Sequence, residues 1–177
     1  MKNKTLLLLG CMLHLALSGQ TFTDITQQSG LNISPGLGDV AVWIDHNNNG
    51  WLDFFYASNN QALFYENNGN GTFTDKTSQS GLSATMPHAV AAGDFDNDGY
   101  TDLLISSIHT STPLKIFRNN SGNGFTEVYA APFSCRRAIW IDYNGNGLLN
   151  ISVSYTHSDA ADEEDSVDLG GRRIIKK

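Results

Sequence analysis

The chain has 177 residues and a formal net charge of -7 at pH 7, and it contains 17 Gly, 17 Asn and 14 Asp against 4 Glu. Asn, Asp and Gly are poor helix formers that turns recruit, so the composition predicts short strands joined by many turns and excludes a coiled coil. The acidic balance argues against a nucleic-acid partner, because phosphate binding requires a basic surface. Residues 20–158 hold 12 acidic and 5 basic residues, and a bound cation is the obvious group to neutralise this excess.

Residues 1–19 have the features of a secretory signal peptide. Two lysines precede an apolar stretch at residues 6–17, and small side chains near residue 18 suit cleavage. Cleavage predicts a chain that is secreted or extracellular, or held in a periplasm or at the cell surface. No later apolar run approaches the roughly 20 residues of a membrane span. Lipoprotein processing at Cys11 is an alternative. If Cys11 is removed, Cys135 has no partner within the chain and is expected to be a small buried residue.

An internal repeat of about 50 residues organises the chain. Residues 22–31 and 73–82 are identical at 8 of 10 positions, and the two segments begin 51 residues apart. Three related loops begin at Asp45, Asp94 and Asp142, with spacings of 49 and 48 residues. A fixed period of this length is typical of repeat architectures such as propellers.

Each repeat is predicted to contain four short strands. The expected strands are residues 40–44, 52–58, 62–66 and 72–77 in the first repeat, and residues 90–93, 102–107, 114–118 and 125–129 in the second. Asn-Gly at residues 70–71 and 123–124 predicts hairpins with type I′ turns. The fold class is therefore all-β, with tandem four-stranded antiparallel blades of a β-propeller. The array is incomplete, at about two and a half blades.

The repeat pattern divides the chain into three parts. The signal peptide occupies residues 1–19, the repeat array residues 20–155, and a charged tail predicted to be disordered residues 156–177. A closed propeller usually needs about four to eight blades, so this chain could close a ring only by self-association. The alternative is a non-autonomous N-terminal fragment of a larger propeller protein.

The three loops follow the pattern D-x-[DN]-x-[DN]-G-x-x-[DN], which suits Ca²⁺. Calcium takes roughly six to eight oxygen ligands: positions 1, 3, 5 and 9 offer side chains, position 7 a backbone carbonyl, and Gly at position 6 permits the turn. Zinc would require thiolate or imidazole ligands that the pattern lacks. The expected ligands are Asp45, Asn47, Asn49, Trp51 and Asp53 in the first loop, Asp94, Asp96, Asp98, Tyr100 and Asp102 in the second, and Asp142, Asn144, Asn146, Leu148 and Asn150 in the third.

Ligand charge predicts unequal calcium affinity among the loops. The second loop has four carboxylates, the first has two and the third has only Asp142, so we expect affinity in that order. One alternative is a set of turns that bind nothing. A helix-loop-helix calcium site is disfavoured, because its Glu at position 12 is replaced by Tyr56, Ile105 and Val153.

These loops and their strands resemble the FG-GAP/VCBS repeat of integrin alpha-type propellers and of many secreted bacterial proteins. Residues 22–31, 63–68 and 73–82 are similar to the phrases that separate the calcium loops in the cartilage acidic protein (ASPIC-type) branch. The resemblance covers residues 22–155, and it implies a calcium-stabilised blade architecture with metal-ligand roles at the loop positions. In the third repeat Asn150 replaces the final Asp and the later strands are missing, and no C-terminal family domain follows.

The sequence favours a binding module over an enzyme. His46, His88, His109 and His157 fall at unrelated positions of the repeat without a Ser or Cys partner, so each is expected to be a surface or turn residue, and no catalytic residue is predicted. The expected role is extracellular adhesion, with a protein or polysaccharide as the partner and calcium as a structural ion. An accessory region of a carbohydrate-active enzyme is a weaker alternative.

Tryptophan placement refines this expectation. Trp43 and Trp140 occupy the same position in two related strands and are expected to pack between blades. Trp51 lies within the first loop and is the better candidate for an exposed binding residue.

Overall fold

The computed structural model describes residues 22–34, 40–58, 62–82, 87–107 and 113–154, together with the backbone of residues 172–175. The expected signal peptide and Cys11 lie outside these residues. No helix in these ranges is long and apolar enough to cross a membrane.

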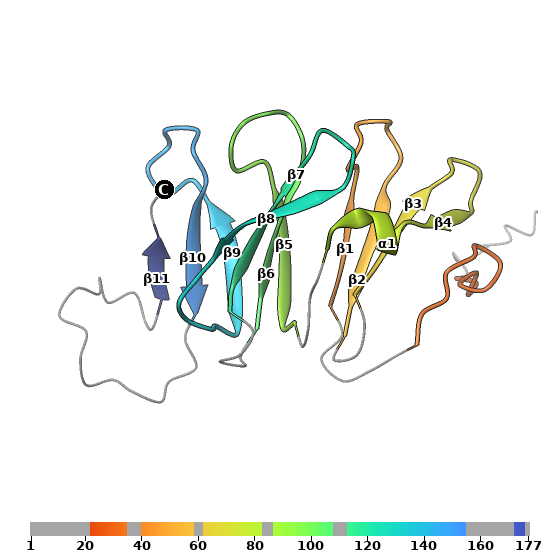
Figure 1. The fold of residues 1–177 in the computed structure, drawn as a ribbon, viewed down its shortest axis with the longest axis horizontal. Coiled ribbons are helices and arrows are strands. Elements are labelled where there is room, and N and C mark those ends of the chain that lie inside the picture. Colours follow the sequence, from red (N-terminus) through yellow and green to blue (C-terminus); the bar gives the residue numbers. More distant parts are fainter. Residues whose placement is uncertain are drawn as a thin grey trace, which may run out of the picture.

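The described chain forms three antiparallel sheets in a row (Figure 1). The first sheet contains β1 (Val40–Ile44), β2 (Asp53–Ala57), β3 (Ala62–Asn67) and β4 (Phe73–Asp75). The second contains β5 (Ala89–Gly93), β6 (Asp102–Ser106), β7 (Lys115–Asn119) and β8 (Phe125–Ala130). The third contains β9 (Arg137–Ile141), β10 (Asn150–Ser154) and β11 (Arg172–Ile175). In each sheet neighbouring strands follow one another along the chain, which confirms the predicted all-β fold of tandem blades in an incomplete array, although no closed propeller is formed.

The tail contains a strand that the sequence analysis did not predict. Residues 156–177 were expected to be disordered, yet β11 pairs with β10, with Ile151 opposite Ile175. The expectation was therefore wrong for residues 172–175. The physical reason is that β10 would otherwise leave a row of unpaired backbone groups, and the β-branched residues Ile174 and Ile175 suit a strand.

The hairpins occur where Asn-Gly predicts them, but their turns are longer than type I′. Between β3 and β4, positive φ falls on Gly69 and Gly71 instead of on Asn70. The Asn70 side chain accepts hydrogen bonds from the backbone N–H and the hydroxyl of Thr72. This side-chain turn lengthens the connection, as Asx turns commonly do.

Apolar side chains fill the space between successive sheets. Phe55 and Phe64 of the first sheet pack in one cluster with Leu103 and Phe117 of the second. A second cluster joins Leu104 and other residues of the second sheet to the third sheet. The central strands β2 and β6 are buried along their whole length because both of their faces are covered.

Cys135 is buried within this second cluster. Burial raises the pKa of its thiol to about 11. A thiol with so high a pKa is scarcely ionised at neutral pH, which agrees with the structural role expected for this residue.

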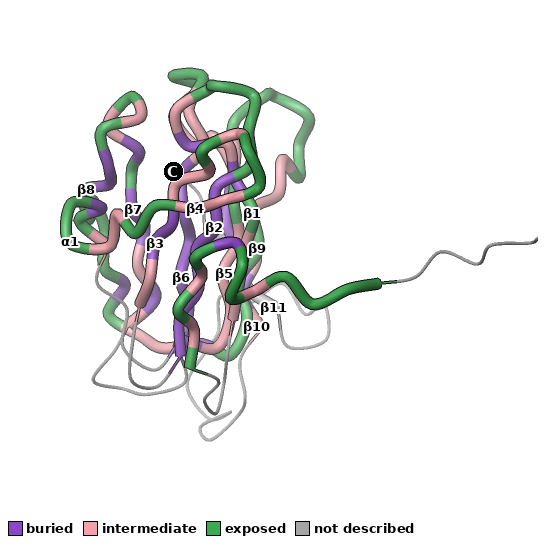
Figure 2. The backbone as a smooth tube through the Cα atoms, turned by 90° about the vertical axis from the view of Figure 1, so that its right-hand side faces the viewer, coloured by how far each residue is buried: buried purple, intermediate pink, exposed green. Residues whose placement is uncertain are grey.

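The outer face of the first sheet is only partly covered. Residues 31–33 pack against Phe54, Tyr56 and Tyr65, but Phe22 is 91% exposed, and Figure 2 shows this end of the chain leaving the sheets.

Trp140 packs between sheets as predicted, stacked on Phe95 with ring centroids 5.8 Å apart. Trp43 does not: it is 50% exposed because no described sheet precedes the first one.

Asn119 provides the buried polar link between the first two sheets. Its amide donates to the carbonyl of His46 in the first loop, at 2.8 Å, and to that of Thr101, at 3.0 Å. Its counterpart Asn67 makes the corresponding bond within its own sheet, to Leu52, and among the described residues it has no side-chain bond to another sheet.

We expect Asn119→Ala to lower the free energy of unfolding by about 2–4 kcal/mol, because it leaves buried carbonyls without donors. Asn67→Ala, a matched change at a half-buried site, should cost about 1 kcal/mol. Urea unfolding followed by circular dichroism measures both values, and equal losses would contradict the assigned cross-sheet role.

Candidate metal centre

The three loops lie at the same edge of the row of sheets, because each joins the first two strands of its sheet (Figure 1). The first loop spans residues 45–53, the second 94–102 and the third 142–150. Repetition of one loop on three adjacent sheets places the acidic residues side by side along this edge.

One set of hydrogen bonds shapes every loop. The first Asp accepts bonds from the backbone N–H groups of positions 5 and 6: for Asp94 these come from Asp98, at 3.1 Å, and Gly99, at 2.8 Å. Asp45 and Asp142 make the same pairs of bonds. The side chain at position 5 accepts the N–H of position 7. The loops thus hold their shape through their own carboxylate and amide oxygens.

The second loop brings carboxylates together. One ligand oxygen from each of Asp94, Asp96 and Asp102 lies within 4.8 Å of the others. Asp96 Oδ1 is buried and has no hydrogen-bond partner within the described part of the chain. Three carboxylates this close repel one another and lose solvation, so the arrangement suits a bound divalent cation with oxygen preference. The fourth predicted carboxylate, Asp98, lies outside this group.

Among the three carboxylates Asp102 is the one that is fully buried, so its charged form loses the most solvation. Burial raises the pKa of its carboxyl to about 6, against the opposing effect of the backbone N–H groups of Asn119 and Phe95, and the charges of Asp96 and Asp98 add to the rise. The raised pKa means that the hydrogen bonds from the protein do not fully compensate the charge of the ionised Asp102 carboxylate.

The ninth position also ties each of the first two loops to its sheet. Asp102 accepts the N–H of Asn119 at 2.7 Å with one oxygen and that of Phe95 at 2.9 Å with the other. Asp53 likewise accepts the N–H of Asn67 at 2.8 Å and that of His46 at 3.1 Å. This residue therefore anchors the loop to the third strand of its own sheet, a role that the ligand pattern alone did not indicate.

His46 is a functional neighbour that sequence reasoning missed. It was expected at the surface or in a turn, yet it is 5% exposed, its Nδ1 contacts Asp53 Oδ2, and its ring packs edge-on against Phe64. The repeat held a signal for this burial. The other two loops carry an aromatic side chain at the same position, Phe95 and Tyr143, which indicates a position that faces the next sheet. In the first loop His46 thus shares an oxygen of the predicted ligand Asp53.

The structure also brings fewer carboxylates together in the first loop than in the second. At position 3, the amide of Asn47 donates to Glu66 at 3.1 Å, and its oxygen accepts the N–H of Asn49 at 3.2 Å. No close group of three acidic or imidazole ligands forms here among the described residues.

The third loop has the same hydrogen-bonded shape as the other two, but Asp142 is its only carboxylate. Backbone N–H groups, that of Gly147 foremost, hold the pKa of Asp142 below its usual range. Asn150 Oδ1 is buried without a hydrogen-bond partner in the described ranges, whereas the Asp at this position in the other loops accepts two.

The seventh position of the three loops is occupied by Trp51, Tyr100 and Leu148. Trp51 is 52% exposed, and its ring lies against Gly69.

Neighbouring loops are joined by the residue at position 4. Asn48 donates to the carbonyl of Gly99 at 2.9 Å, and Asn97 donates to that of Gly147 at 3.2 Å. Both asparagines adopt positive φ, at 57° and 59°, which their short polar side chains tolerate. The third loop has Gly145 at this position, which carries no side chain to continue the series.

Comparison with known proteins agrees with this geometry. Residues 45–105, which contain the first two loops, match the FG-GAP-like repeat family. The chain is 25% identical over 138 residues to cartilage acidic protein 1 of Xenopus tropicalis, an alignment that covers 73% of this chain and 21% of that protein. The chain thus spans about a fifth of the length of this relative. These matches confirm the resemblance inferred from the repeats: residues 45–105, which hold the first two acidic loops, are similar to FG-GAP-like repeats, and the chain is similar to cartilage acidic protein 1.

Proposed function

We propose that this chain is a secreted, noncatalytic adhesion module whose FG-GAP-like blades bind structural calcium at the acidic loops. The observation that carries the proposal is the close group of Asp94, Asp96 and Asp102 in the second loop. The related repeat family and the relative named above support an extracellular setting. The partner in this proposal is a protein or a polysaccharide.

The chemistry of the donor set favours calcium. All the side-chain donors are hard carboxylate or amide oxygens, and calcium accepts more of them, in more flexible geometry, than magnesium does. In the second loop Asp94, Asp96 and Asp102 would hold the ion, which would supply the positive charge that this group of one buried and two half-buried carboxylates lacks. Asp98 would need to turn away from the N–H of Tyr100, at 2.9 Å, or share its oxygen.

A structural role follows from the position of the site. The Asp102 carboxylate also accepts the backbone N–H of Asn119, and Asn119 donates to the first sheet. An ion bound at Asp102 would therefore stabilise the contact between two sheets as well as one loop.

The chelator experiment tests calcium binding directly. At free calcium 100-fold above the dissociation constant, one site adds about 2.7 kcal/mol of stability. For a domain of this size that corresponds to a rise in Tm of roughly 5–15 °C. Thermal unfolding of the full chain by circular dichroism, with calcium and with chelator, measures the shift, and magnesium at equal ionic strength is the control. Equal Tm values in all three conditions would refute the proposal.

Asp96→Asn should weaken calcium binding by about tenfold or more, because it removes ligand charge from the second loop. It should leave the Tm in chelator unchanged or higher, since it relieves repulsion. Asp75→Asn is the matched control, because Asp75 lies outside the loops and its Oδ1 accepts the N–H of Thr77. Isothermal titration calorimetry measures the calcium affinity of both variants, and thermal unfolding in chelator measures their Tm. An unaltered affinity in Asp96→Asn would remove this residue from the site.

The raised pKa of Asp102 predicts opposite pH trends with and without calcium. The folded pKa of about 6 exceeds 3.8, the ordinary pKa of an aspartate carboxyl, so without calcium the folded state binds the proton more tightly. This contribution to stability is complete below about pH 4 and is lost as pH rises through 6.

Calcium requires the ionised carboxylate, so the gain in Tm on adding calcium should be larger at about pH 7 than at about pH 5. Unfolding in calcium-free and calcium-loaded buffers at both values provides the measurement. In Asp102→Asn the calcium-free difference between the two pH values should shrink, and a difference of unchanged size would assign it to another group.

A further inference from the structure

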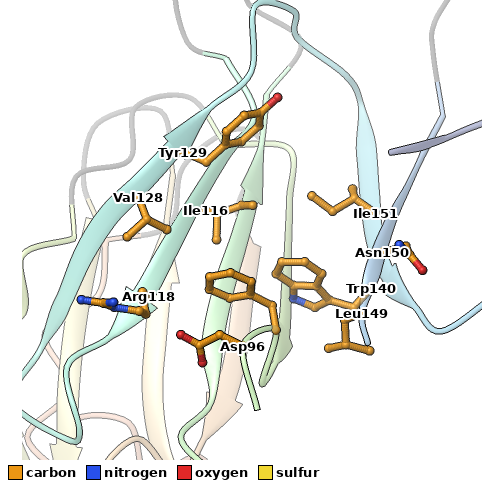
Figure 3. Close-up of a pocket in the computed structure, with 10 residues that line it drawn as sticks. Asp96, Ile116, Arg118, Val128, Tyr129, Trp140, Leu149, Asn150 and Ile151 are labelled. Atoms are coloured by element: carbon orange, nitrogen blue, oxygen red, sulfur yellow. The ribbon is translucent and has the colours of Figure 1, made fainter. Parts of the chain in front are cut away.

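A cavity of about 400 Å³ opens between the second and third sheets (Figure 3). Ile116, Trp140 and Ile151 form apolar parts of its wall, and Asp96 and Asn150 lie near one end. Three buried polar atoms among these lining residues have no hydrogen-bond partner within the described ranges: Asp96 Oδ1, Trp140 Nε1 and Asn150 Oδ1. The apolar part of this cavity has room for a side chain from another strand, because protein interiors are otherwise close-packed.

The first two sheets show what fills the equivalent space. Phe125, at the start of β8, packs edge-on against Phe64 with ring centroids 5.7 Å apart, and its ring lies 6.4 Å from that of His46. The counterparts of Phe64 and His46 in the second sheet are Ile116 and Phe95, and both line the cavity. The cavity therefore lies where a phenylalanine from a fourth strand of the third sheet would pack.

The third sheet is prepared for such a strand. β11 pairs with β10 in the register of a third strand: Ile151 is opposite Ile175 just as Leu103 is opposite Phe117. Within the described residues no fourth strand follows it, so the outer edge of β11 is open.

The chain carries a matching strand sequence at its other end. Residues 22–31 repeat residues 73–82, in which Phe73 begins β4, a fourth strand. Both copies of the repeat continue in the same way. Gly30 adjoins the carbonyl of Phe73 on the first sheet, and Gly81 adjoins that of Phe125 on the second. The exposed Phe22 therefore belongs by position to a sheet that would precede the first one.

A second pair of surfaces matches in the same direction. Trp140 stacks on Phe95 of the preceding sheet, whereas its counterpart Trp43 is 50% exposed. At the opposite end of the row Tyr143, the counterpart of Phe95, is 41% exposed, and Ile139 is 51% exposed. Each end of the row thus exposes apolar side chains at positions that make an inter-sheet contact elsewhere in the molecule.

We propose that residues 22–24 of a second copy of this chain form the fourth strand of the third sheet, with Phe22 in the cavity and Trp43 against Tyr143. Within one copy the two ends lie at opposite sides of the row of sheets, so the donor is another molecule (Figure 1). The described part of each copy has three sheets, and two copies joined head to tail at both ends would supply six of them, within the roughly four to eight of closed propellers. This surface borders the second and third loops, because Asp96 and Asn150 line the cavity and Tyr143 lies in the third loop.

Sedimentation equilibrium of the full chain in calcium tests the proposal. The expected species is a dimer, twice the 19.3 kDa of one chain. Phe22→Ala and Trp43→Ala should each raise the dimer dissociation constant by at least about tenfold, as truncation of an aromatic anchor does. Lys76→Ala is the control, since it also truncates a long, partly exposed side chain, but Lys76 pairs with Glu66 of β3 and lies outside the loops and the two ends of the row. It should dimerise like the unaltered chain.

Circular dichroism in the same buffer verifies that each variant is folded, and the exposure of Phe22 predicts that its removal leaves the monomer intact. A folded monomer of the unaltered chain would overturn the proposal, as would a dimer that Phe22→Ala does not weaken or a series of open oligomers. Because folding and calcium binding are measured separately, a calcium-loaded monomer would refute the association alone.

Discussion

The buried carboxylate at the ninth loop position is the group on which the rest of the structure depends. Asp102 accepts backbone N–H groups from its own loop and from β7, and Asp53 does the same in the first sheet. A continuous buried series links the two: Asp102 contacts Asn119, Asn119 contacts His46, and His46 contacts Asp53. Loop shape, strand pairing and the contact between sheets are thus connected through one set of polar groups.

Burial of charge gives this arrangement its cost and its use. A carboxylate removed from water is unfavourable unless it is paired, and hydrogen bonds from backbone N–H groups compensate only part of the charge. In the second loop the remaining charge of Asp94, Asp96 and Asp102 is concentrated at one point. Such a group stabilises the fold when a cation neutralises it and destabilises the fold when none does. Bonds from Asn48 and Asn97 to the next loop extend this dependence along the row.

The ends of the row illustrate a general constraint on repeat proteins. Each sheet buries its faces against its neighbours, so terminal sheets keep apolar faces and strand edges that no neighbour covers. Among the described residues Trp43 and Phe22 are exposed at one end and Ile139 at the other, and a cavity lies beside the third sheet, so the two ends are complementary if the proposed association occurs. Complementary ends favour head-to-tail association, because the new contact repeats one that already exists within the molecule.

The sequence by itself determined the repeat, the all-β class, the strands of the first two sheets and the loop pattern. These features depend on local chemistry: glycine and asparagine at turns, alternation in strands, and an Asp/Asn spacing that recurs at about 50 residues. Because each strand pairs with the next along the chain, local signals were sufficient to place them.

Only the tertiary structure decided which side chains meet across the repeats. The burial of His46 against Asp53, the bond from Asn119 to the preceding loop, the exposure of Trp43 and the strand at Arg172–Ile175 all depend on groups distant in sequence. A pattern within one repeat records neither what lies on the next sheet nor whether a neighbouring sheet is there.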